Sequence, residues 1–283
     1  DAIVKVSDDA AAVVFGTVGT EMKGVKVIGG NDLSSMLMLT DKDGKPSKML
    51  PGKVSNTVGF LDSIKVKVKA KNIPGEDAVN TGLLSTICYK YETRLTANVC
   101  VDAAPFSFQK QRKPCDAKLP IAFQSQGAPV AVKRIDTLSP EKVAVKKIVD
   151  DLGLEKEIIL VRPKFKIYFA NVGNGLVIDK DSLSLFCTDK DVKEDISDKV
   201  RIVWVDSVML NDNELKCNNK DDKGIARPIT ITGNLANDFV LCTYTANDFA
   251  DGSGVFATPL KIGLSYGYRS TSDPVPVRVE KGF

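Results

Sequence analysis

The sequence contains no histidine among its 283 residues. Histidine is the side chain that changes charge nearest to neutral pH, and it is the commonest metal ligand in proteins. Its absence excludes Ser-His-Asp and Cys-His nucleophiles, zinc sites of the HExxH type and histidine-ligated haem. Paired carboxylates and a Ser-Lys dyad are the acid–base devices that the sequence leaves open. We therefore expect a protein that is not an enzyme and that carries no cofactor.

The lack of long apolar runs and of strong charge limits the partners of the chain. No run approaches the roughly 18 apolar residues of a membrane-spanning helix, so we expect no membrane span in the mature chain. The formal net charge is only +3, and no basic stretch is interleaved with aromatic residues, so we expect no nucleic-acid partner. Residues 64–71 alternate between apolar side chains and lysine. That pattern is typical of a strand whose charged face discourages edge-to-edge pairing.

The cysteines are even in number and never arranged as CxxC. They are Cys88, Cys100, Cys115, Cys187, Cys217 and Cys242. Zinc sites built from thiolates need closely spaced pairs, so disulfides in an oxidising compartment fit better, with buried free thiols as the alternative. The chain begins at Asp1 rather than Met, as expected of a mature chain that has lost a signal peptide or of a truncated chain. We expect an extracellular or cell-surface protein.

Two disulfide pairings are open in the first half of the chain. Cys100 and Cys115 flank a polar, proline-containing segment, and a bridge between them would stabilise the end of the domain by roughly 3 kcal/mol. Cys88 could instead face Cys100 across a hairpin. The second half holds three cysteines, one more than a single bridge uses. We favour the pair Cys100 and Cys115.

Alternation and turn residues predict an antiparallel β protein. Short alternating segments are separated by Gly, Asn, Asp and Pro. A similar unit, a Tyr-x-Tyr strand followed by a polar turn and a Val-x-Val strand, occurs at residues 87–101 and again at residues 264–279. Such a repeat predicts two tandem domains of related build. We expect its tyrosines to be structural, as in the tyrosine corner of β-sandwiches, rather than to line a binding surface: Tyr89, Tyr91, Tyr266 and Tyr268.

The predicted fold is all-β, with two tandem immunoglobulin-like β-sandwich domains and one short helical insertion. Residues 1–123 form the expected N-terminal sandwich, and residues 132–283 form the C-terminal immunoglobulin-like sandwich. Residues 124–131, which contain Gly and Pro, are the expected linker.

The helical insertion is expected at residues 139–153. Ser139 suits the N-cap and Pro140 suits the first helical position. Apolar residues follow at helical spacing, and Gly153 suits the C-terminal stop. We expect this helix to cover an open end of the second domain.

Several segments resemble, in one order, a family of secreted or lipid-anchored surface proteins of small-genome archaea that has no assigned activity. They are residues 31–37, 72–75, 88–93, 100–102 and 126–132. Residues 165–175 are similar to the core of adhesion-type immunoglobulin-like domains of prokaryotic surface proteins. These scattered segments imply a β-sandwich fold and a cell-surface location, and they imply no chemistry. The helix at residues 139–153 departs from the family, where a plain strand-to-strand passage is expected.

Oxygen-rich loops are the candidate metal sites. Residues 41–44 are similar to the start of a calcium loop but lack the closing Glu. Asp248, Asp251 and Ser253 form a second polar loop, and residues 211–222 form a third. Polar turn chemistry explains all three equally well. Calcium is the ion that such loops would hold, and the sequence assigns it to none of them.

We expect an extracellular structural protein that assembles into a cell-surface filament or surface layer. The alternative is an adhesion or binding module for carbohydrate or for a partner cell surface. A glycosidase that uses paired carboxylates is a third candidate, and it would need two acids converging in a cleft. The many acids of this chain lie in predicted turns instead.

The N-terminal residues 1–15 suggest how assembly would occur. Two β-prone apolar stretches are followed by Gly16 and Gly19, which could form a hinge. Such a segment can pack in its own domain, or it can complete the sheet of a neighbouring subunit and form a homopolymer by strand exchange. The sequence leaves both arrangements open. The expected assembly residues, of which the last three are the anchors, are Ile3, Val4, Val6, Val13, Val14 and Phe15.

Overall fold

The chain is described by a computed structural model. The described residues are 2–7, 12–17, 25–27, 37–38, 61–66, 68–70, 78–83, 86–103, 114–124, 127–149, 155–186, 196–221, 224–246, 249–250, 254–273 and 275–280. Features expected from the sequence that lie outside them include Cys187, the candidate calcium loop at residues 41–44, the second candidate loop residues Asp248, Asp251 and Ser253, the hinge residue Gly19, and residues 8–11 of the assembly segment.

The larger of two main sheets has eight strands in the order β14-β13-β19-β8-β2-β4, with β12 beside β19 and β16 beside β13. Its strands are β2 (Ala12–Thr17), β4 (Leu37–Met38), β8 (Thr86–Asp102), β12 (Leu176–Ile178), β13 (Ile202–Leu210), β14 (Asn213–Glu214), β16 (Ile229–Thr230) and β19 (Val255–Thr271). The two longest strands, β8 and β19, pair antiparallel over their whole length.

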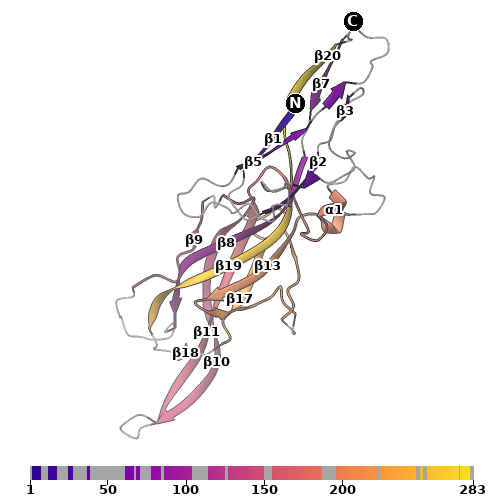
Figure 1. The fold of residues 1–283 in the computed structure, drawn as a ribbon. Coiled ribbons are helices and arrows are strands. Elements are labelled where there is room, and N and C mark those ends of the chain that lie inside the picture. The colour runs from indigo at the N-terminus through magenta and orange to yellow at the C-terminus, as the bar shows by residue number, and fades with distance from the viewer. Residues whose placement is uncertain are drawn as a thin grey trace.

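The smaller main sheet has six strands in the order β15-β17-β11-β10-β9, with β18 beside β11. They are β9 (Ile121–Ala122), β10 (Val130–Val149), β11 (Glu155–Asn171), β15 (Lys216–Cys217), β17 (Phe239–Thr243) and β18 (Phe249–Ala250). The hairpin of β10 and β11 extends beyond the rest of the sheet, away from the end of the molecule where both termini lie (Figure 1).

Three two-stranded sheets lie at the end of the molecule that carries the termini (Figure 1). They pair β1 (Ala2–Ser7) with β5 (Leu61–Val66), β3 (Val25–Val27) with β6 (Val68–Ala70), and β7 (Ala78–Leu83) with β20 (Val275–Glu280). The single lysine-rich strand expected at residues 64–71 is therefore divided between β5 and β6, which have different partners.

The two main sheets pack face to face around one hydrophobic core, as in a β-sandwich. On the long strands β8 and β11 buried residues alternate with more exposed ones over much of their length, as the two-residue period of a strand requires. On β8 the buried side chains include Val99 and Val101, and on β11 they include Phe165, Ile167 and Phe169. The all-β fold class is confirmed.

The two similar units of the sequence are neighbours in one sheet and not matching parts of two domains. Tyr89 lies opposite Tyr268, and Tyr91 lies opposite Tyr266, in the pairing of β8 with β19. Residues that face each other across two strands share one environment, so similar residue types suit both. Since strands from both halves share one sheet and one core, residues 124–131 do not separate two sandwiches.

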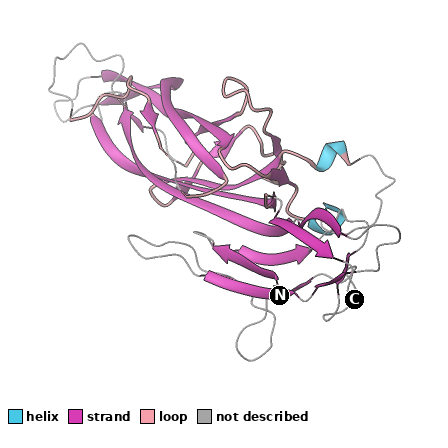
Figure 2. Cartoon of the chain, turned by 90° about the horizontal axis from the view of Figure 1, so that it is seen from above, coloured by secondary structure: helices cyan, strands magenta, loops and turns pink. Residues whose placement is uncertain are grey.

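The helix expected at residues 139–153 is wrong, because residues 139–149 continue β10 and pair with β11. Pro140 falls at a register shift between Leu138 and Glu141, where a missing backbone N–H removes no regular ladder bond. The following Val and Ile residues are β-branched and favour strands. Among the residues that the structure describes, helix occurs in the short turns α1 (Leu183–Phe186) and η1 (Ser197–Lys199) (Figure 2). No helix in the described part of the chain has the length and apolar character needed to cross a membrane.

Candidate assembly edge and its supporting core

The four expected tyrosines form one aromatic seam inside the sandwich, across β8 and β19. The rings of Tyr91 and Tyr266 are stacked with centroids 5.5 Å apart, and those of Tyr89 and Tyr268 lie 5.7 Å apart. Tyr89 and Tyr91 are also in contact, at 5.8 Å. Such pairs contribute about 0.5–1.5 kcal/mol each beyond the area that they bury. The seam therefore fastens β8 to β19 from the core side.

The hydroxyl of Tyr266 belongs to a closed ring of hydrogen bonds. Thr93 Oγ1 donates to the carbonyl of Val130 at 3.0 Å. Since that donation uses the only hydroxyl proton of Thr93, the contact of 3.0 Å between the two hydroxyls must be donated by Tyr266. The N–H of Val130 in turn donates to the Tyr266 hydroxyl at 3.0 Å. All three polar groups are satisfied, and the start of β10 is held to β8.

Tyr268 fixes the turn after β11. Its hydroxyl accepts a hydrogen bond from the N–H of Gly175 at 2.5 Å. Burial raises the pKa of this hydroxyl, and the bond from Gly175 opposes that rise. A Cβ on Gly175 would come 2.3 Å from the carbonyl oxygen of Arg269, so glycine is required by this close approach. Tyr266 and Tyr268 thus bind backbone groups of the chain itself.

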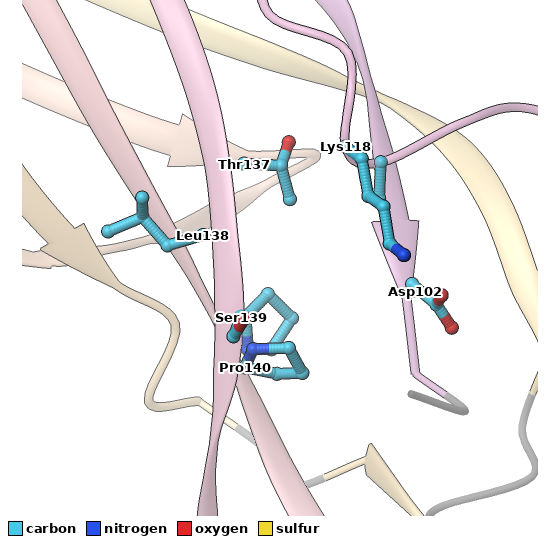
Figure 3. A pocket seen from close by; sticks show the side chains of 8 residues that line it. Asp102, Lys118, Thr137, Leu138, Ser139 and Pro140 are labelled. Carbon is cyan, nitrogen blue, oxygen red and sulfur yellow. The ribbon is translucent and has the colours of Figure 1, made fainter. Parts of the chain in front are cut away.

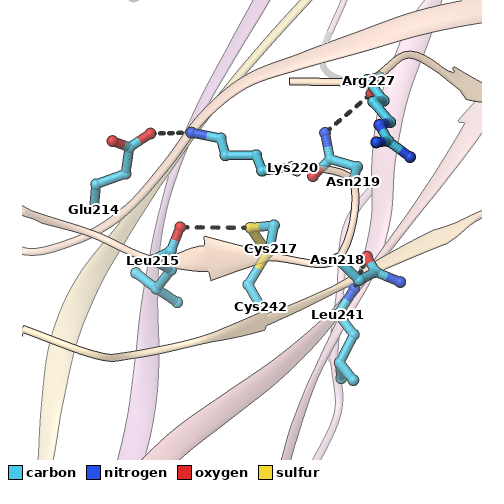
Figure 4. The surroundings of a disulfide bond; sticks show 9 residues. All are labelled: Glu214, Leu215, Cys217, Asn218, Asn219, Lys220, Arg227, Leu241 and Cys242. Carbon is cyan, nitrogen blue, oxygen red and sulfur yellow. Dashed lines mark hydrogen bonds and ion pairs between the residues drawn. A yellow bond between two sulfur atoms is a disulfide. The ribbon is translucent and has the colours of Figure 1, made fainter. Parts of the chain in front are cut away.

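Among the described residues, two disulfides link segments of the sandwich. Cys100 on β8 is joined to Cys115, the pair that we favoured, with Cα atoms 5.8 Å apart. Cys217 and Cys242 lie directly opposite each other on β15 and β17 and are joined as well. Figure 4 shows the second bridge beside the hydrogen bond from the Leu241 N–H to Asn218 Oδ1, 3.0 Å long.

A small pocket lies beside the first disulfide, between the end of β8 and β10 (Figure 3). Its volume is about 110 Å³, and Asp102, Lys118 and Thr137 contribute polar groups to its lining. Ligand sites usually enclose about 300–1,000 Å³, so the pocket is small for a substrate cleft.

Two acids of the third candidate loop, which lies around β14 and β15, are paired with lysines. Asp212 contacts Lys261 at 3.2 Å, and Glu214 forms an ion pair with Lys220 (Figure 4). Within the described ranges, no group of three or more His, Cys, Asp or Glu side chains is placed to hold a metal ion.

The outer edge of β8 is the feature that most clearly invites a partner. β19 pairs with one side of β8 along all of its residues. On the other side, β2 pairs only from Thr86 to Tyr91. From Glu92 to Asn98, no strand among the described residues pairs with that side. We call residues 92–98 the open edge.

Backbone direction along the open edge follows from two hydrogen bonds near its end. The N–H of Ala103 donates to Gly254, next to β19, at 3.0 Å. The carbonyl of Cys100 accepts from Thr137 Oγ1 on the opposite side, at 3.3 Å. Because backbone groups alternate in direction along a strand, the N–H and C=O groups of residues 92, 94, 96 and 98 point away from β19. They are the groups that an added strand would bind.

Apolar side chains border the open edge on its inner side. β8 lies against β10 through the Thr93 and Thr137 hydrogen bonds described above, and β9 follows β10 in the other sheet. The position beyond β8 therefore lies over β9. Leu95, Ile121 and Phe123 pack against the core there and are only partly buried. An added strand would cover them.

The expected assembly residues are paired within their own chain. Ile3, Val4 and Val6 lie on β1 and face β5, with Val4 opposite Ile64. The anchors lie on β2 and face the first part of β8, with Val14 opposite Tyr89. Sequence reasoning found this segment but missed the edge beside it. The signal for this edge was the alternation of polar and apolar residues at 94–99, which continues the strand beyond the part that β2 covers.

Comparison with protein-family models, curated proteins and solved structures finds no match to this chain. The resemblance to archaeal surface proteins therefore stays a prediction.

Proposed function

We propose that this protein is an extracellular structural subunit that assembles into a cell-surface filament or surface layer by strand exchange. The observation that carries the proposal is the open edge of β8. A long unpaired edge in a soluble protein invites pairing with another chain, and proteins usually shorten, charge or cover such edges. Here the edge is long and adjoins partly exposed apolar side chains. The two disulfides are compatible with an oxidising compartment.

The N-terminal segment, residues 1–15, is the proposed donor. β2 already occupies the first part of the edge in its own chain. A strand that binds in its own subunit can bind in the same way in a neighbour, because exchange keeps the contacts and changes only the chain that supplies them. When each subunit donates to the next, the head-to-tail contact need not close, and a filament grows.

Substitution of Thr96 by proline tests the acceptor edge. The N–H of Thr96 points away from β19, so Thr96→Pro removes a donor for an added strand and keeps the ladder with β19. We expect a folded, monomeric protein whose filaments are lost in electron micrographs and light scattering. Thr96→Val is the matched control, since it keeps the N–H and should still assemble.

Deletion of residues 1–15 tests the donor. The truncated chain should be soluble and folded but unable to polymerise, as judged by circular dichroism and electron microscopy. Filaments formed by the truncated chain would exclude strand donation by this segment. A monodisperse full-length monomer that binds glycans on an array would instead favour an adhesion module.

A further inference from the structure

We infer that the N-terminal segment of a second copy pairs with the outer edge of β8 from Thr86 to Val99, in the register that β2 already has. In that register Ser7 lies opposite Thr96 and Val4 lies opposite Val99. This inference rests on the proposed function, and it names the surface and the alignment through which two copies join.

The register follows from the observed pairing of β2 with β8. Thr17 lies opposite Thr86, and the pairs continue without a shift to Ala12 opposite Tyr91. Extending the same antiparallel alignment residue by residue toward the N-terminus brings Val4 opposite Val99. The next residue of β8, Cys100, already accepts a hydrogen bond from Thr137 Oγ1 on that side, so the inferred pairing ends at Val99. The segment before β2 is therefore long enough to fill the open edge.

Side-chain alternation supports this register over a slipped one. Residues opposite each other on two strands point to the same face of a sheet. Ala97 and Val99 of β8 are buried, which places Val6 and Val4 on the core side. Lys5 and Ser7 then point outward, beside the exposed residues 96 and 98. A slip of one residue would turn both valines to water and Lys5 to the core.

The sequence of the segment complements the residues along the open edge. Val4 and Val6 would extend the apolar cover toward Leu95, Ile121 and Phe123, which are partly exposed on that side. Asp9 comes opposite Arg94, whose guanidinium is exposed, and an opposite-charge pair across strands contributes about 0.2–1 kcal/mol.

Asp8 is the one residue that the register places less favourably. It falls on the inner face, opposite Leu95. That position is only partly buried, so its carboxylate can stay in contact with water. The cost of an isolated buried charge therefore does not arise there.

The partner that the segment gives up is a weak one. β1 and β5 form a two-stranded sheet of their own, outside both main sheets. An isolated pair of strands is marginally stable in water. Pairing with β8 instead extends the main sheet and covers apolar surface. We therefore expect pairing of β1 with β8 of a second copy to gain more free energy than separation of β1 from β5 loses.

Cysteine pairs at defined positions test the register. The full-length variant with Ser7→Cys and Thr96→Cys brings two outward, non-core positions together in the inferred alignment. A disulfide needs Cβ atoms within about 3.5–4.5 Å, so a pair displaced by two residues should not join. Ser7→Cys with Asn98→Cys is this displaced control, and Asn98, like Thr96, is exposed. Ser7→Cys with Leu61→Cys reports the pairing of β1 with β5.

After assembly and mild oxidation, a denaturing non-reducing gel gives the result. We expect a ladder of covalent oligomers from the Thr96 pair, a loss of that ladder in the Asn98 control, and separate single variants that reach dimers at most. A ladder from the Asn98 pair that matches or exceeds the Thr96 ladder would overturn the register. A covalent monomer from the Thr96 pair, identified by its mass, would show that the segment fills the edge of its own chain and would overturn the second copy as occupant.

Failure of the register can be told apart from failure of the proposed function. If electron micrographs show filaments while only the Leu61 pair joins, the register is wrong and assembly stands. If the unmutated protein forms no filaments under any condition that keeps it folded, both the proposed function and the inferred register are refuted.

Discussion

Removing the Tyr266 hydroxyl should destabilise the sandwich more than any other single-atom deletion along the seam. Tyr266→Phe keeps the ring and its stacking on Tyr91. It removes the acceptor of the Val130 N–H and the donor to Thr93. The side chains involved are buried, with Tyr266 fully shielded from solvent, so water cannot replace the lost partner without opening the core.

The magnitude follows from the groups left behind. A buried N–H without an acceptor costs about 1–3 kcal/mol, and the lost bond to Thr93 adds roughly 0.5–1.5 kcal/mol. We therefore expect Tyr266→Phe to lower the free energy of unfolding by about 2–4 kcal/mol. Thr93→Val breaks the same ring from the other side. The double variant should cost less than the sum of the two single variants, since each already disrupts the shared network.

Denaturant unfolding followed by fluorescence and circular dichroism measures the effect. The midpoint should fall while the slope with denaturant stays unchanged, as expected when stability alone changes. Tyr244→Phe is the control, because Tyr244 is buried and its hydroxyl has no hydrogen bond to another described residue that would be lost. A Tyr266→Phe variant within about 0.5 kcal/mol of the unmutated protein, or strictly additive single variants, would refute the closed ring.

Three further predictions concern the same framework. Gly175→Ala should lower stability by about 1–3 kcal/mol in thermal unfolding, because its Cβ would press on the Arg269 carbonyl, and an unchanged melting temperature would contradict that contact. Burial raises the pKa of Tyr268 above 10.0 in the folded protein. The contribution of this hydroxyl to the free energy of unfolding is therefore complete below that value and is lost as pH rises through the higher folded pKa. Between about pH 9 and about pH 11, the free energy of unfolding should fall less steeply with pH in Tyr268→Phe than in the unmutated protein. Equal slopes in the two proteins would exclude Tyr268 as the cause of the fall. Two disulfides hold four of the six cysteines, so alkylation of the denatured, unreduced chain should label two at most, and a mass with more labels would exclude one of the bridges.

Sequence alone was sufficient for the fold class. Period-two alternation between turn residues describes the backbone of a strand directly, and most strands here follow it. The same local information suggested Cys100 and Cys115, since a short loop brings its ends together easily, and the structure joins that pair. Both features depend on residues close together in the chain.

Features that depend on distant residues were misjudged. The two tyrosine units suggested a duplicated domain. Similar segments can belong to separate domains or lie side by side in one sheet, and sequence similarity does not distinguish the two cases. Tyr91 and Tyr266 resemble each other because they share one pocket of the core, as cross-strand neighbours do. Similarly, residues 139–149 have apolar side chains that fit a helical period and a strand equally well. Pairing with β11, which the local pattern does not contain, decides for the strand.

The open edge was beyond sequence reasoning for a different reason. A sheet edge is the side of a strand along which no other strand pairs. Only the full pairing of the sheet shows where β2 ends while β8 continues. The N-terminal segment that we propose as donor could be predicted because its β-prone pattern lies in its own residues. The proposed acceptor edge depends on the pairing of the whole sheet.

Under the proposed function, β8 serves folding and assembly through different groups. Its odd-numbered residues from 91 to 101 supply core side chains, including the stacked Tyr91, and backbone groups on one side belong to the ladder with β19. Backbone groups of residues 92, 94, 96 and 98 point the other way and contribute nothing to that ladder. A substitution can therefore remove one function and keep the other: Tyr266→Phe weakens the fold and leaves the edge intact, whereas Thr96→Pro blocks the edge and leaves the seam intact. If the two variants showed the same defect, in stability and in assembly alike, β8 would have to be a single cooperative element and the division of its two sides would be wrong.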